Sequence, residues 1–62
     1  MKKVPAIRIH YYNTNREIDG LIMIETTKEK ALQFFHQRYP HFDVYDAEET
    51  TEYVYEENLN NN

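Results

Sequence analysis

Three histidines are the side chains best suited to metal binding or acid–base chemistry. His36 and His41 are separated by Pro40, and their spacing does not match the i, i+3 or i, i+4 positions that share a helix face. His10 belongs to another segment. The 62-residue chain has no Ser and no Cys, which removes the commonest nucleophiles, thiolate ligands and disulfides. Its single Gly rules out a glycine-rich phosphate loop. We expect neither enzymatic activity nor a bound metal or cofactor.

Carboxylates interleaved with tyrosines dominate the C-terminal part of the chain. All 7 Lys and Arg residues lie within residues 1–38, whereas residues 39–62 contain acids and no base, and the formal net charge is −4. The acids fit a solvated sheet edge that resists further strands, an Asp43–Arg8 cross-strand pair, or a nucleic-acid-like surface that enters a basic groove. The predicted partner-binding residues are Tyr12, Leu21, Met23, Tyr45, Asp46, Glu48, Glu49, Glu52, Tyr53, Glu56 and Glu57.

Two strands are expected before any helix. Residues 4–12 alternate apolar and polar side chains, with the period of two that places one set on each face. Residues 13–15 read Asn-Thr-Asn, and asparagine is typical of turns. The second strand runs from Ile18 to Glu25. Asp19-Gly20 fits either a bulge or a second, later turn, and we prefer the bulge.

One helix follows the second strand. Thr26 and Glu29 have the spacing of a capping box, in which each side chain satisfies the backbone N–H of the other residue. An apolar stripe at helical spacing comprises Ala31, Leu32, Phe35 and Tyr39. Pro40 disfavours the helical conformation at the residue before it, so we expect the helix to stop there.

The acidic segment after the helix is predicted to form a third strand over residues 42–45 and a fourth over 51–56, joined by a short acidic hairpin. Asp46 and Glu49 also fit a helix cap, which leaves residues 47–57 open between strand and helix. The sequence thus predicts an α+β domain over residues 1–57, with a ββαββ order, and a disordered Asn-rich tail over 58–62. The expected sheet is an antiparallel split β-α-β sheet of order 2-1-3-4, with the helix packed on one face.

A single helix covers only one face of such a sheet. The covered face is expected to contain Ile7, Ile9, Tyr11, Ile22, Ile24, Phe42 and Val44. The open face is expected to contain Arg8, His10, Tyr12, Leu21, Met23, Asp43, Tyr45, Glu52, Val54 and Glu56. Because this open face includes large apolar side chains, we expect it to meet a second copy of the chain or a foreign protein.

The layout resembles that of small acidic accessory proteins of bacteriophages and mobile elements. The resemblance spans residues 5–57 and includes the helix opening at 26–35, the Tyr39-Pro40 stop and the acidic end. It implies a non-enzymatic inhibitor in the cytoplasm of a bacterial host, where such proteins block DNA-binding or defence machinery, anti-CRISPR proteins and restriction inhibitors among them. The apolar run over residues 21–24 is too short to span a membrane.

A single-stranded nucleic-acid-binding module is the alternative function. In this hypothesis Tyr12 and Tyr45 stack on bases, while Arg8 and His10 contact phosphates. The negative net charge opposes the electrostatic attraction that dominates nucleic-acid affinity.

Overall fold

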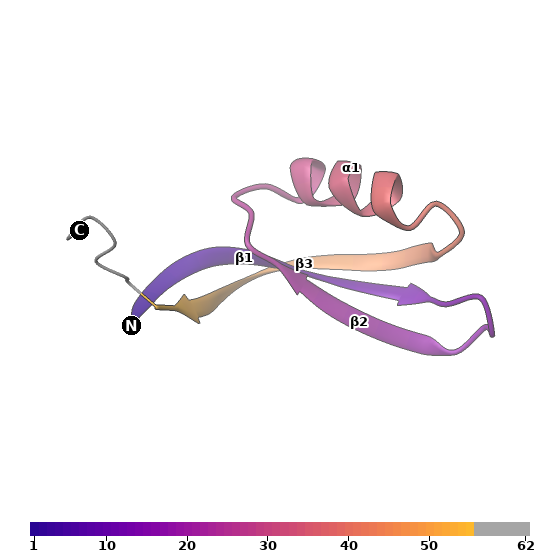
Figure 1. The fold of residues 1–62 in the computed structure, drawn as a ribbon, viewed down its shortest axis with the longest axis horizontal. Coiled ribbons are helices and arrows are strands. Elements are labelled where there is room, and N and C mark those ends of the chain that lie inside the picture. The colour runs from indigo at the N-terminus through magenta and orange to yellow at the C-terminus, as the bar shows by residue number, and fades with distance from the viewer. Residues whose placement is uncertain (56–62) are drawn as a thin grey trace, which may run out of the picture.

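A computed structural model describes residues 1–55 of the chain. Its elements are β1 (Lys2–Tyr12), β2 (Ile18–Met23), α1 (Lys28–Arg38) and β3 (Asp43–Val54). The strands form one antiparallel sheet of order β2-β1-β3, and α1 lies over one face of it (Figure 1). The predicted α+β class with one helix on one face is confirmed. Residues 56–62, which include the predicted tail, lie outside the described residues.

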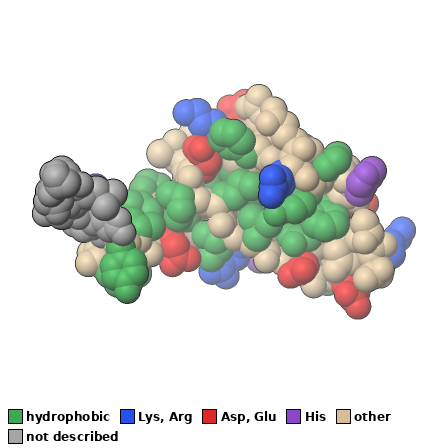
Figure 2. Space-filling view, viewed as in Figure 1, with side chains coloured by type: hydrophobic (Ala, Val, Ile, Leu, Met, Phe, Trp, Pro, Cys, Tyr) green, Lys and Arg blue, Asp and Glu red, His purple; other side chains and the backbone are tan. Residues whose placement is uncertain are grey.

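The core lies where α1 crosses the sheet. Its buried members are Ile7, Ile9 and Tyr11 of β1 and Ala31 and Phe35 of α1. Phe42 stacks between two tyrosines, with ring centroids 4.9 Å from Tyr11 and 5.3 Å from Tyr39. Figure 2 shows hydrophobic side chains gathered between α1 and the sheet, with charged side chains around them. The predicted inward positions of Ile7, Ile9 and Tyr11 are confirmed.

The turn after β1 is built on Asn13, as the sequence predicts. Its Oδ1 accepts the backbone N–H groups of Asn15 at 2.9 Å and Glu17 at 3.0 Å. The positive φ of this turn is found at Arg16, at 64°, rather than at an asparagine. The side-chain bonds of Asn13 stand in for backbone bonds, and they bring the chain into β2.

The predicted faces of β2 are wrong. The strand pairs with β1 in an unbroken register, with Leu21 opposite Ile9 and Met23 opposite Ile7, so no bulge occurs at Gly20. Directly opposite residues of an antiparallel pair share a face. Leu21 and Met23 therefore lie on the helix side, where they pack against the core, and Ile22 takes the open side.

The predicted fourth strand and acidic hairpin are also wrong. Within residues 1–55, the whole stretch Asp43–Val54 is one strand, which pairs with β1 from Tyr12 back to Lys2. The long β1 supplies partners for the acidic residues, and this pairing also decides against the helix alternative over the described part of residues 47–57. The sheet's bulge is at Tyr45, because His10 lies opposite Asp46 while Tyr11 lies opposite Val44.

The helix begins one residue later than the capping box predicts. Thr27 is the N-cap, and its Oγ1 accepts the N–H of Lys30 at 3.2 Å. Thr26 instead donates its N–H to the Glu25 carboxylate at 3.1 Å. The predicted stop at Pro40 is confirmed, because Tyr39 is the C-cap.

The helix is much shorter than the strands beneath it. Its 11 residues span about 16 Å, whereas the 12 residues of β3 span about 40 Å. The N-terminal end of β1 and the C-terminal end of β3 therefore extend past the helix as a two-stranded ribbon (Figure 1). Among residues 1–55, no element covers the other sheet face or this two-stranded arm.

Candidate functional site

The sheet face turned away from α1, here called the open face, is the candidate site. Pairing with β1 defines its members, because directly opposite residues of an antiparallel sheet point to the same side. The open face contains Arg8, His10 and Tyr12 of β1, Ile18, Gly20 and Ile22 of β2, and Asp43, Tyr45, Asp46, Glu48 and Glu52 of β3.

Four carboxylates of β3 form an acidic row along one side of the open face. This row comprises Asp43, Asp46, Glu48 and Glu52. Apart from the position of the bulge, the row follows the two-residue period of the strand. Because β3 is at the edge of the sheet, the row faces solvent along its outer side and is free to meet an approaching molecule.

The bulge in β3 brings an aromatic group beside the acidic row. An extra residue at a bulge lets two successive side chains lie on the same side of the sheet, and here these are Tyr45 and Asp46. The Tyr45 ring centroid is 5.1 Å from that of Tyr12 and 5.9 Å from that of His10. Tyr12 is 39% and Tyr45 50% exposed, so both rings remain available for contact.

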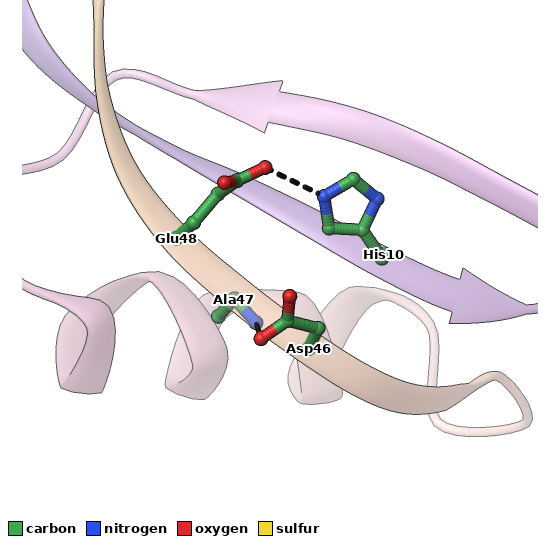
Figure 3. A network of polar contacts seen from close by, with 4 residues as sticks. All are labelled: His10, Asp46, Ala47 and Glu48. Carbon is green, nitrogen blue, oxygen red and sulfur yellow. Dashed lines mark hydrogen bonds and ion pairs between the residues drawn. The ribbon is translucent and has the colours of Figure 1, made fainter.

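His10 and Glu48 are joined by a hydrogen bond on this face. Figure 3 shows the two side chains pointing toward one another from β1 and β3, with Nε2 of His10 2.9 Å from Oε1 of Glu48. The Asp46 carboxylate accepts the N–H of the following residue, Ala47, at 2.9 Å. The contact with His10 holds the Glu48 carboxylate in place, while Asp46 and Glu52 each accept the backbone N–H of the residue that follows them.

The predicted Asp43–Arg8 pair is not formed. Asp43 lies opposite Tyr12, and Arg8 lies opposite Glu48 on one side and Ile22 on the other. Among residues 1–55 no carboxylate lies within ion-pair distance of the Arg8 guanidinium. Arg8 thus adds a positive charge to the middle strand, next to the acidic row.

A shallow hollow lies over β1 and β2. It has a volume of about 270 Å³ and is lined by Arg8, His10, Gly20, Leu21 and Ile22. Gly20 faces His10 across the strand pair, and its missing side chain leaves the space open. The sequence analysis did not identify this hollow, although a lone glycine inside a strand is a signal of close approach by another group.

The structure brings together five of the predicted partner-binding residues. Tyr12, Tyr45, Asp46, Glu48 and Glu52 share the open face.

The other predicted partner-binding residues do not join this group. Leu21 and Met23 pack against the core, while Glu49 lies opposite Ile7 and Tyr53 opposite Lys3, on the helix side of β3. Glu56 and Glu57 lie outside the described residues. Sequence reasoning missed Ile18 and Ile22 as members of the open face, because it assigned the wrong phase to β2.

The histidines do not assemble around a common point. His36 lies in the last turn of α1, and His41 lies in the connection to β3. Across residues 1–55 there is no group of three or more His, Cys, Asp or Glu side chains placed to hold a metal ion. The single helix in this part of the chain is also too short and too polar to cross a membrane.

Comparisons with protein-family models, with curated proteins and with solved structures found no match to this chain.

Proposed function

We propose that this protein is a non-enzymatic accessory protein whose open face binds a basic surface of another protein. The observation that carries the proposal is the acidic row beside the exposed Tyr12 and Tyr45, on a face that no other element of residues 1–55 covers. Tyrosines supply contact area at low entropic cost, while carboxylates select a partner of opposite charge. A phage-type inhibitor of host DNA-binding or defence proteins would act in this way.

Electrostatic attraction would operate before contact. The chain has a net charge of −4, and the acidic row concentrates negative charge on one side of the sheet. Such a field raises the association rate with a positively charged surface and is screened by salt. A basic groove shaped for nucleic acid presents the complementary charge and accepts flat rings, which is why nucleic-acid mimicry is the preferred form of this proposal.

The charge pattern favours a foreign partner over a second copy on the open face. Sheets that pack face to face keep their strands roughly aligned, which leaves two kinds of two-fold arrangement. An axis across the strands places the acidic row on the acidic row of the other copy. An axis along the strands places it on the β2 side, against Ile18 and Ile22, because β2 and β3 flank β1. Both arrangements bury carboxylates without a positive partner, which is costly.

Direct nucleic-acid binding remains the alternative function. The pairing of Tyr12 with Tyr45 at 5.1 Å offers two neighbouring rings for base stacking, and Arg8 lies on the same face. The acidic row occupies the adjacent strand, where it would repel phosphates. The two functions therefore predict opposite results with a polyanion.

The proposal is tested by capture from a bacterial lysate with three baits. One bait is the native chain, and the second is a row variant that carries Asp46→Asn, Glu48→Gln and Glu52→Gln. The third is a charge-matched variant that carries Glu17→Gln, Glu25→Gln and Glu29→Gln, all outside the open face. We expect a basic protein to be retained by the native and charge-matched baits and lost from the row variant.

Two results would contradict the proposal. The first is equal retention of every bound protein by all three baits. The second is direct binding of a labelled single-stranded oligonucleotide that is lost on Tyr12→Ala or Tyr45→Ala, since this would establish the alternative function.

A further inference from the structure

The outer edge of β3 is a long strand edge with no neighbour. The strand is at one end of the sheet order β2-β1-β3, and among residues 1–55 only β1 pairs with it. Figure 1 shows α1 on the β3 side of the sheet, next to the part of β3 that follows the helix, while the C-terminal part of β3 runs on past the helix. In an antiparallel edge strand, alternate residues present N–H and C=O groups to the outside. Beyond the bulge at Tyr45, the register runs without interruption from Asp46 to Val54, which gives a regular template.

The edge strand carries acidic side chains on both faces of the sheet. Asp46, Glu48 and Glu52 belong to the open face, while Glu49 lies opposite Ile7 and so points to the helix side. A strand added at this edge would alternate its own side chains between the same two sides. Lysines or arginines placed opposite the four acids of this stretch would therefore each find a carboxylate across the new pair; these acids are Asp46, Glu48, Glu49 and Glu52.

We propose that β3 binds its basic partner by strand addition, with an extended lysine- or arginine-rich segment of the partner pairing antiparallel to Asp46–Val54. This inference rests on the proposed function, which requires a basic partner but not this mode of contact. Main-chain hydrogen bonds supply the affinity in strand addition, and side-chain complementarity supplies the specificity.

The other strand edges do not fit the same occupant. The stretch of β1 that β2 leaves unpaired contains Lys2, Lys3 and Pro5, so it repels a basic segment and lacks one N–H donor. A second copy of β3 is disfavoured as well. The stretch Asp46–Val54 contains four acids and no Lys or Arg, so a second copy would bring these carboxylates together without a cation to pair them.

Backbone N-methylation separates strand addition from purely ionic contact. The probe is a peptide of about nine residues, a common strand length, that alternates lysine and threonine. It is prepared unmodified and in two N-methylated forms, which block alternate amides in the two possible phases. We expect one methylated form to bind the protein at least about tenfold more weakly, and the other to bind like the unmodified peptide, because its methyl groups point away from β3.

Amide hydrogen exchange provides a second readout on the protein. Binding of the unmodified peptide is expected to slow exchange at alternate residues of Asp46–Val54, because only those residues have outward N–H groups. Equal affinities of the two methylated forms, or no affinity for the unmodified peptide, would overturn strand addition while leaving docking by the open face intact. The proposed function itself fails separately, if the row variant retains the lysate partner as the native chain does.

Discussion

Phe35 holds the aromatic core together. It is fully buried at 0% exposure and contacts the rings of Tyr11, Tyr39 and Phe42 at centroid distances of 5.0, 5.2 and 6.3 Å. Replacing it with alanine removes these contacts and leaves a cavity. We expect Phe35→Ala to lower the free energy of unfolding, measured by urea denaturation, by about 3–5 kcal/mol. A loss of this size is comparable with the whole stability that a single small core supplies.

Phe34 provides the matched control for this prediction. It is the preceding residue of the same helix but is 55% exposed, so Phe34→Ala should change the unfolding free energy by less than about 1 kcal/mol. Equal losses for the two variants would contradict the core position of Phe35.

Tyr11 makes stability sensitive to alkaline pH. Its pKa is raised above the ordinary value of 10.0, first by burial and then by the negative charge of Asp19 across the strand pair and by Tyr39. A raised pKa in the folded state means that the stabilisation is complete below pH 10 and declines as pH rises above it, because the unfolded chain releases the proton first. When the pH is raised from about 9 to 11, we expect the free energy of unfolding to fall less in Tyr11→Phe than in the native chain. Urea denaturation at each pH measures this.

An exposed tyrosine separates this effect from general alkaline destabilisation. Tyr55→Phe should lose stability with the same pH dependence as the native chain, because Tyr55 is exposed. If Tyr11→Phe also matches the native pH dependence, the assigned role of burial at Tyr11 is wrong.

At the scale of elements, the helix start depends on one hydroxyl. Thr27 Oγ1 accepts the N–H of Lys30, whereas the hydroxyl of Thr26 has no hydrogen bond within the part of the chain that the structure describes. Thr27→Ala should therefore lower the unfolding free energy by about 1 kcal/mol, and Thr26→Ala by a few tenths at most. Thermal denaturation of the two variants side by side measures the difference, and the reverse order would restore the capping box at Thr26.

The strength of the local pattern determined which elements could be predicted. In β1, large apolar residues alternate with Arg8 and His10, so both the strand and its faces were evident. In β2 the run Leu21-Ile22-Met23-Ile24 is apolar at every position. The sequence of this run therefore does not indicate which of its residues face the helix. The register of β2 with β1 determines this. The adjacent threonines at 26 and 27 left the helix cap similarly ambiguous.

The local sequence did not predict that residues 43–54 form one continuous strand. Its acidic and threonine-rich sequence has weak preferences of its own, and its continuity follows from the length of β1 opposite it. The bulge that joins Tyr45 to the acidic row likewise arises from pairing rather than from a turn residue. Tyr12, Tyr45 and three of the carboxylates were predicted as partner-binding residues from their types, but Tyr45 and Asp46 share a face only because of the bulge. The hollow over Gly20 required the correct register of β2.

At the scale of the whole molecule, the fold is a long three-stranded sheet packed against one short helix. The principal extents are 45 × 21 × 19 Å, and α1 covers less than half of the longest dimension on one face only (Figure 1). So thin an architecture has little depth for a catalytic pocket but offers a wide surface relative to its size. The acidic row and the paired tyrosines lie on the uncovered face, and the proposed recognition of a basic protein rests on them.

The most direct test of this account is the affinity of the row variant for the basic partner, compared with that of the charge-matched variant by titration calorimetry. Both variants remove three negative charges, so they differ only in where the charges lie. We expect the row variant to bind at least about tenfold more weakly than the native chain, and the charge-matched variant to bind within about twofold of it. Equal weakening of both variants would show that net charge alone governs binding, and it would contradict the central claim that the open face is the docking site.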